Sequence, residues 1–235
     1  MLKAKMVKKA RPIIFNTEMI RAILNGTKTQ TRRLVRHMPE IKNGETGVFE
    51  KMDDGTFQMR IDQYNGTIYD YPIKPMFSVG DFLYVSETQK IHRTQDCQGS
   101  DVVVVNYIAD GTTRNFYVSE KEWKRLGKYN LEGNKYFSPY WTTKETARLF
   151  LKITDIRVER LQDITEEDAV EEGCFAGCRE IKTGPWGVED DPEVWTAVEA
   201  FQDVWAETIK RTEIDQYGWD ANPWVFVYTF KVIKV

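Results

Sequence analysis

The chain has 235 residues, of which 41% are hydrophobic and 29% are charged, as is ordinary for a globular protein. This length suffices for one sizeable domain, or for one domain with a large insertion. The net charge of −3 excludes a protein that coats nucleic acid indiscriminately, because such coating needs many cations to neutralise phosphates. Any nucleic-acid contact is therefore expected from a local basic patch.

The N-terminal residues 1–11 are basic and are not followed by a hydrophobic region, so they predict a flexible arm rather than a signal peptide. No apolar run is long enough to cross a bilayer, and no membrane partner is expected. The three cysteines are odd in number and do not form a disulfide framework. These features predict that the protein is located in a reducing cytoplasm.

A short amphipathic helix is predicted near the N-terminus. Asn16 or Thr17 can cap it, and Gly26 is its expected end. Its apolar residues recur at helical spacing and are expected to be buried: Met19, Ile20, Ile23 and Leu24. The cationic, hydroxyl-rich segment Thr27–Arg33 follows directly. It is either a positioned functional site or a solvated basic strand.

Residues 40–75 are predicted to be a β-meander inserted into the core domain. Asn43-Gly44, Asp54-Gly55 and Asn65-Gly66 are strong hairpin-turn signals between short apolar runs. The apolar content of the segment is too low for it to be stable alone.

The rest of the chain predicts more strands than helices, mostly joined by hairpins. The predicted strands are 82–87, 102–109, 113–118, 148–161 and 224–235; the predicted helices start at Ser119 and Thr165 and span 192–209; the predicted loops are 91–100, 127–141 and 174–191. The natural architecture is an α+β fold in which helices lie beside a β-barrel.

Four blocks of sequence resemble one family in the same order. The residues of the first block, 23–33, follow the pattern I-L-x-G-x-K-T-x-T-x-R. The later blocks are Gly80-Asp81 with V-S-E-T at 85–88, I-R-V-E-R-L-Q-D-I-T-E-E-D-A-V-E-E-G at 156–173, and W-D-A-N-P-W-V-F-V-Y at 219–228. Together they resemble the ASCH domain, and in particular the longer ASCH proteins of bacteriophages and prophages.

The resemblance implies a PUA-like β-barrel with flanking helices, in a single ASCH-type domain over residues 1–235 of a phage or prophage protein. Its expected location is the cytoplasm of a bacterial host. It also implies that the partner is a nucleoside or a single-stranded nucleic acid, and that RNA is favoured over DNA. The small ASCH amidohydrolases release acetate from N4-acetylcytidine. Their catalytic lysine, threonine and carboxylate match Lys28, Thr31 and Glu172 here. No cofactor and no metal are expected.

The residue chemistry is compatible with those roles. A lysine becomes a nucleophile or base only when its pKa is lowered, and Arg32 and Arg33 are close enough in sequence to lower that of Lys28. Residues three apart in a regular strand face opposite sides, so Lys28 and Thr31 converge only if Lys28 still lies in the turn after Gly26. The alternative is a surface lysine beside a strand.

In the hydrolysis that these residues predict, Lys28 attacks the acyl carbonyl or activates water, Thr31 contacts the oxyanion or orients the nucleophile, and Glu172 protonates the departing amine. Glu172 is expected at a helix C-terminus, where the dipole disfavours negative charge. The alternative is a solvated acidic helix face. Thr29, Arg32 and Arg33 are predicted to contact the substrate.

Two further positions are candidates for base recognition. Glu87 either reads a base edge or pairs with an arginine. Trp219 and Asn222 together offer a stacking ring and an amide, which is how unpaired nucleotides are commonly held, whereas core packing better explains Trp224.

Three other readings stay open at this point. A non-catalytic reader of RNA or of a modified base would use the same cleft. A phage assembly accessory protein would display extensive apolar surface. Cys174 and Cys178, with His37 or His92, are a weak candidate for a zinc site because their spacing is loose and they lack a second close pair.

Overall fold

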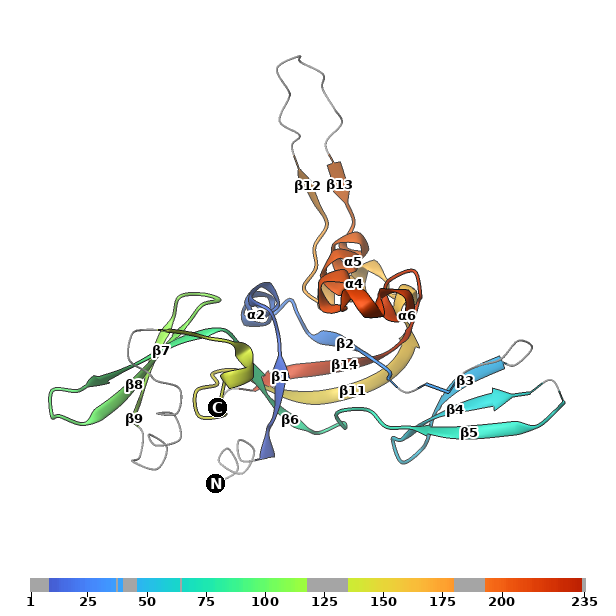
Figure 1. The fold of residues 1–235 in the computed structure, drawn as a ribbon, viewed down its shortest axis with the longest axis horizontal. Coiled ribbons are helices and arrows are strands. Elements are labelled where there is room, and N and C mark those ends of the chain that lie inside the picture. The colour runs from blue at the N-terminus through green and yellow to red at the C-terminus, as the bar shows by residue number, and fades with distance from the viewer. Residues whose placement is uncertain are drawn as a thin grey trace, which may run out of the picture. The chain divides into compact units, whose positions relative to one another are not determined.

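The computed structural model describes residues 9–36, 38–39, 46–63, 65–117, 135–179 and 193–233. These form a mixed α+β fold with mostly strands and few helices, which confirms the predicted class (Figure 1). Contacts divide the chain into two units. Unit 1 is Met1–Gly26, Asp81–Lys152 and Lys231–Val235, and unit 2 is Thr27–Gly80 and Ile153–Phe230. The prediction of one domain over residues 1–235 stays a prediction.

In unit 1, β1 (Arg11–Ile14) runs parallel to β6 (Phe82–Ser86), and β6 pairs antiparallel with the first residues of β11 (Phe150–Arg160). Helix α2 (Thr17–Leu24) follows β1. As predicted, the Asn16 side chain caps α2 by accepting from the backbone N–H of Met19, and Gly26 after it has φ of +85°. Of the predicted stripe, Ile20 and Ile23 are buried and Met19 is partly buried, whereas Leu24 is 41% exposed, so the prediction is wrong at Leu24.

The second sheet of unit 1 has the order β10-β7-β8-β9. Its strands are β7 (Gln89–Gln95), β8 (Asp101–Tyr107), β9 (Thr113–Tyr117) and β10 (Lys135–Phe137), and the 3₁₀ turn η2 (Pro139–Trp141) follows. The predicted loop over 91–100 is wrong up to Gln95. The reason is tertiary pairing, since the polar β7 lies between β10 and the valine-rich β8 and its Ile91 packs against Val103 and Val105. The predicted helix at Ser119 falls outside the described residues.

In unit 2, the remainder of β11, then β14 (Trp224–Ile233) and β2 (Gln30–Leu34) lie side by side. β14 pairs antiparallel with β2, so that Val227 lies opposite Arg32 and Tyr228 lies opposite Thr31. Figure 1 shows α4 (Glu166–Glu171), α5 (Ala197–Thr208) and α6 (Ile214–Tyr217) together on one side of these strands. On that side Val225 and Val227 pack with Phe201 and Trp205 of α5.

The predicted meander of residues 40–75 is confirmed for its described part, as β3 (Thr46–Lys51), β4 (Phe57–Asp62) and β5 (Ile68–Ile73). Gly55 and Gly66 take the left-handed conformation that the two turns require, with φ of +80° and +79°. The meander packs on aromatic residues of β14, through edge-to-face contacts that join Phe49 to Trp224 and Phe57 to Phe226.

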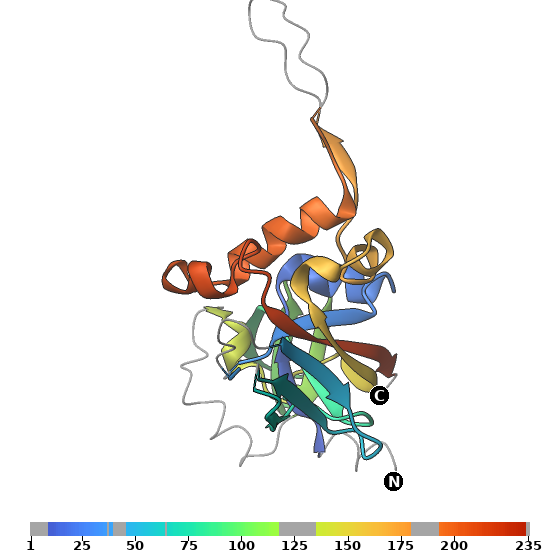
Figure 2. The ribbon, with the colours of Figure 1, turned by 90° about the vertical axis from the view of Figure 1, so that its right-hand side faces the viewer.

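The long helix predicted over 192–209 begins only at Ala197. Glu193–Trp195 instead form β13, which pairs with β12 (Gly177–Arg179) inside the predicted loop 174–191. Figure 2 shows these two strands leaving the N-terminal end of α5. Two 3₁₀ turns complete unit 2: η3 (Leu161–Asp163) and η4 (Arg211–Glu213). The described strands do not close into the predicted barrel, because β1 and β2 each have a single sheet neighbour.

Candidate functional site

Lys28 and Glu172 meet in the interior of unit 2. Thr165 caps α4 by accepting from the N–H of Asp168, and α4 ends at Glu172. Lys28 lies just before β2, and its Nζ donates to the Glu172 side chain (Oε2, 2.6 Å) and to the Glu172 backbone carbonyl (2.7 Å). Both side chains are buried, with exposed fractions of 0% and 2%. The structure therefore brings together two of the three predicted catalytic residues.

Burial and the neighbouring Glu172 act on the pKa of Lys28 in opposite directions. Burial lowers the pKa of Lys28 below its ordinary value of 10.5, and the charge and hydrogen bond of Glu172 oppose this change. The positive charge of Arg33 also lowers this pKa, as the sequence predicts, but to a smaller extent than burial does. The Cys174 thiol belongs to the same surroundings, and burial raises its pKa to about 11. Burial is thus the main influence on the pKa values of both Lys28 and Cys174.

Arg32 was predicted to contact substrate, but its side chain is fully buried against carboxylates. One guanidinium nitrogen donates to Glu159 (2.5 Å) and to Asp168 (3.0 Å), and the other donates to Glu172 at 3.3 Å. The guanidinium carbon also lies 5.7 Å from the centre of the Phe201 ring of α5. The two terminal nitrogens of Arg32 are thus held by this protein's own carboxylates, whereas its buried Nε has no hydrogen-bond partner among the described residues.

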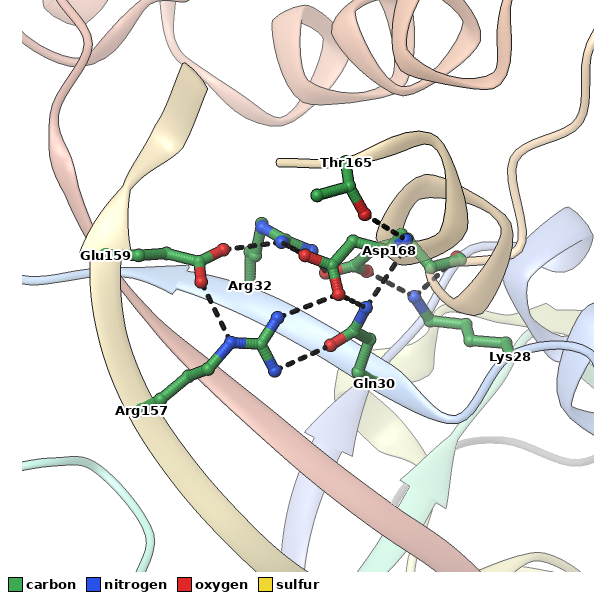
Figure 3. Close-up of polar contacts among 8 residues, drawn as sticks. Lys28, Gln30, Arg32, Arg157, Glu159, Thr165 and Asp168 are labelled. Atoms are coloured by element: carbon green, nitrogen blue, oxygen red, sulfur yellow. Dashed lines mark hydrogen bonds and ion pairs between the residues drawn. The ribbon is translucent and has the colours of Figure 1, made fainter. Parts of the chain in front are cut away.

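Arg157 and the buried Gln30 complete the network, and Arg157 is its partly exposed member (Figure 3). Arg157 of β11 donates to Glu159 (2.8 Å), to Asp168 (2.8 Å) and to the Gln30 side chain (3.1 Å). Gln30 in turn donates to the Asp168 carboxylate at 2.8 Å. Burial alone would raise the pKa of Asp168, but the hydrogen bond from Gln30 and the charges of Arg32 and Arg157 outweigh it and lower that pKa.

Sequence reasoning did not assign Gln30, Arg157, Glu159 and Asp168 to the site. The signal that would have found them is strand alternation. Lys28, Gln30 and Arg32 are two residues apart along an extended chain, and all three contact α4 or the residue that ends it. Arg157 and Glu159 have the same spacing on β11.

Thr31 and Arg33 alternate with these residues along β2. Thr31 lies directly opposite Tyr228, and directly opposed residues of antiparallel strands share a face. The Tyr228 ring contacts Phe77 at 5.4 Å, on the face away from Phe201 and α5. No hydrogen bond among the described residues joins Thr31 to Lys28 or Glu172. Thr31 is buried and Arg33 is half-buried.

Thr29 joins the two elements of the site through its backbone. Its N–H donates to the carbonyl of Glu171 (2.8 Å), and its carbonyl accepts from the N–H of Phe230 (2.8 Å). These bonds connect the end of α4 to the start of β2 and to β14. They hold the backbone next to Lys28 in place.

Glu87 belongs to unit 1, where it pairs with an arginine. Both carboxylate oxygens accept from Arg148 at 2.8 Å, and Arg148 also donates to Asp110 and stacks on the Tyr107 ring at 4.2 Å. Burial raises the pKa of Glu87, and Arg148 opposes that change. These contacts match the ion-pair reading of Glu87 from the sequence.

Trp219 and Asn222 make contacts that shape the turn before β14. The Trp219 ring packs edge-on against Phe201 at 6.4 Å and is partly buried. Asn222 has φ of 44°, and its side-chain oxygen accepts from the N–H of Gln162 at 2.9 Å. The partly buried Trp224 ring contacts the Phe49 ring at 4.6 Å and the Arg160 guanidinium at 4.3 Å, so it packs on this protein's own side chains.

Within the described ranges, no group of three or more His, Cys, Asp or Glu side chains is arranged to hold a metal ion. No described helix is long and apolar enough to span a membrane. No family model matches the chain, and no curated protein or solved structure matches it either.

Proposed function

We propose that this protein is an ASCH-type, PUA-like protein that binds a nucleobase and hydrolyses the amide of an N4-acylated cytosine. The observation that carries the proposal is the hydrogen bond between Lys28 and Glu172, the lysine and the carboxylate that the sequence blocks point to. An amine and a carboxylate that share a proton can exchange it with a reacting amide. The lowered pKa of Lys28 supports the same reading, because it makes the protonated amine a better proton donor than an ordinary lysine.

The proposal assigns the chemistry to Lys28 and Glu172. Both are buried, so the acyl group reaches Nζ only after local opening beside Lys28. Thr31 shares its face of β2 with Tyr228 and enters the proposal as a residue to test rather than as a third catalytic group. Arg33, the next cation along β2, is half-buried and is the residue that the proposal assigns to contact with a pyrimidine carbonyl or a phosphate.

A non-catalytic reader of RNA or of a modified base is the second candidate. It is favoured by the complete burial of Arg32 among Glu159, Asp168 and Glu172, because such a network also serves to fix α4 on β2. In this case the Lys28–Glu172 pair stabilises the fold, and the ligand is bound there without being hydrolysed.

The deciding experiment measures release of cytidine and acetate from N4-acetylcytidine by the wild type and by the Lys28→Ala and Glu172→Gln variants. Lys51→Ala is the matched control, because Lys51 is a half-exposed lysine of unit 2 that pairs with Asp155. If the protein is the proposed hydrolase, the wild type and Lys51→Ala turn over the substrate. Lys28→Ala and Glu172→Gln both lose this activity. Equal turnover by Lys28→Ala and the wild type would refute the catalytic role.

The same proteins distinguish the reader. Binding of a single-stranded oligonucleotide that carries N4-acetylcytidine, with no cleavage of its acetyl group, would identify a reader. Lys28→Ala would then weaken binding only modestly. Absence of both turnover and binding would contradict both candidates.

A further inference from the structure

We infer that Arg32 is a positioning residue that orients the Glu172 carboxylate toward Lys28 and biases their shared proton toward Lys28. The inference deepens the proposed hydrolysis and rests on it for the kinetic consequence. The predicted effect on protonation needs no substrate, so it can be tested even if the proposed function fails.

The orientation follows from the two oxygens of Glu172. Oε2 accepts from Lys28 Nζ at 2.6 Å, and Oε1 accepts from a nitrogen of Arg32 at 3.3 Å. A carboxylate held by a cation on each oxygen has one favoured rotation about its terminal bond. Because the Arg32 side chain is fully buried, water does not substitute for it in this role.

Arg32 is itself fixed by groups from three elements. Glu159 of β11 and Asp168 of α4 accept from one of its nitrogens, and Phe201 of α5 lies against the guanidinium. Arg157 then holds both Glu159 and Asp168 from the more exposed side of the network (Figure 3). The guanidinium therefore presents its other nitrogen to Glu172 in one defined position.

The charges of the network decide where the proton lies. Three cations (Lys28, Arg32 and Arg157) face three carboxylates (Glu159, Asp168 and Glu172). Among the described residues, Arg33 of β2 and the Cys174 thiol also act on Lys28.

An arginine does not lose its proton in proteins, so Arg32 is a permanent positive charge beside Glu172. That charge favours the carboxylate form of Glu172 and hence a protonated Lys28. Without it, two cations remain for three carboxylates, and the proton moves toward Glu172.

The location of the proton on Lys28 assigns each of the two residues a role in the hydrolysis. Glu172 takes a proton from water while the water oxygen bonds to the acyl carbon, and the Lys28 ammonium gives a proton to the departing amine as the C–N bond breaks. The products are the free amine and the carboxylic acid. Protonated Glu172 then returns its proton to neutral Lys28 through their 2.6 Å hydrogen bond, which restores the starting state. Glu172 is thus the base toward water, in contrast to the acid role that the sequence predicts.

The test compares the wild type with Arg32→Gln and Arg32→Lys. Arg60→Gln is the matched control, because Arg60 also bridges two carboxylates, Glu50 and Asp70, but on the meander and partly exposed. NMR of the Lys28 Nζ and of the Glu172 carboxyl carbon reports which group carries the proton as the pH is changed.

At neutral pH we expect the wild type and Arg60→Gln to show an ammonium at Lys28 and a carboxylate at Glu172. In Arg32→Gln the shared proton should lie more on Glu172 and less on Lys28 than it does in the wild type at the same pH. Arg32→Lys keeps the positive charge but loses the planar guanidinium. The proton should therefore be shared between Lys28 and Glu172 much as in the wild type. With N4-acetylcytidine as substrate, the acidic limb of the pH profile of kcat/KM should move to higher pH in Arg32→Gln. Arg32→Lys should lower kcat without moving this limb.

A neutral Lys28 with a protonated Glu172 in the wild type at neutral pH would overturn the inference. So would an Arg32→Gln variant that is less stable but titrates like the wild type, since Arg32 would then be only structural. If Arg32→Gln fails to fold, the wild-type titration and Arg32→Lys still decide the question. If the wild type shows no turnover, the NMR titration tests the inference without the proposed function.

Discussion

Lys28 and Glu172 are 144 positions apart in the sequence, yet their side chains share a hydrogen bond of 2.6 Å from which solvent is excluded. A buried ion pair that loses one partner leaves the other charge uncompensated, which typically costs about 3–5 kcal/mol. We therefore expect Lys28→Met and Glu172→Leu each to lower the free energy of unfolding strongly. The Lys28→Met/Glu172→Leu double variant should lose less than the sum of the two single variants.

Urea denaturation of the four proteins measures this coupling. Lys51→Met is the control for the loss of a lysine, and because Lys51 is 47% exposed it should change the free energy of unfolding by less than about 0.5 kcal/mol. Strict additivity of the two single changes would contradict the direct contact on which the candidate site depends.

Asp168 makes the network sensitive to acid. Its pKa is lowered below the ordinary value of 3.8, because Gln30, Arg32 and Arg157 together outweigh the effect of burial. A carboxylate with a lowered pKa in the folded state adds stability that is fully present above 3.8 and is lost as the pH falls through the folded-state pKa. The destabilisation caused by Asp168→Asn, about 1–3 kcal/mol for hydrogen bonds to a charged group, should thus be constant near neutral pH and shrink below about pH 4.

Denaturation of the wild type and Asp168→Asn across that range measures the difference. Asp155→Asn changes a carboxylate that is 56% exposed and should have little effect at neutral pH. If the difference in the free energy of unfolding between the wild type and Asp168→Asn grows as the pH falls, the lowered pKa of Asp168 is contradicted.

Local signals in the sequence predicted much of the fold correctly. The Asn16 cap, the glycine turns at Gly55 and Gly66, and the three-stranded meander each depend on residues that are neighbours in the chain. The strand β7 was missed because its polar residues are held in place by pairing with β8 and β10, which no local pattern encodes.

For the site, the resemblance to ASCH domains pointed to Lys28 and Glu172, and the structure joins them. It did not reveal that Arg32 is buried, since a cationic segment gives no sign of which carboxylates will surround it. Glu159 and Asp168 come from β11 and α4, more than a hundred residues further along the chain, and their approach to Arg32 depends on how these elements pack.

Variants of Asn222 distinguish a structural role of the W-D-A-N-P-W block from a role in base recognition. Its φ of 44° lies in the left-handed region, which asparagine and glycine tolerate and β-branched residues do not. Its side-chain oxygen also accepts from the N–H of Gln162. Asn222→Gly keeps the backbone conformation and loses only that hydrogen bond, so it should cost about 1 kcal/mol, whereas Asn222→Val adds backbone strain and should cost about 1–3 kcal/mol more.

Thermal and urea denaturation of both variants tests this order. Binding of N4-acetylcytidine or of an oligonucleotide that carries it is measured on Asn222→Gly, because this variant keeps the turn. If Asn222 only shapes the turn, Asn222→Gly binds like the wild type despite its lower stability. A loss of binding by Asn222→Gly at a temperature where it is fully folded would show instead that the amide itself recognises the base, and equal stability of the glycine and valine variants would contradict the structural role.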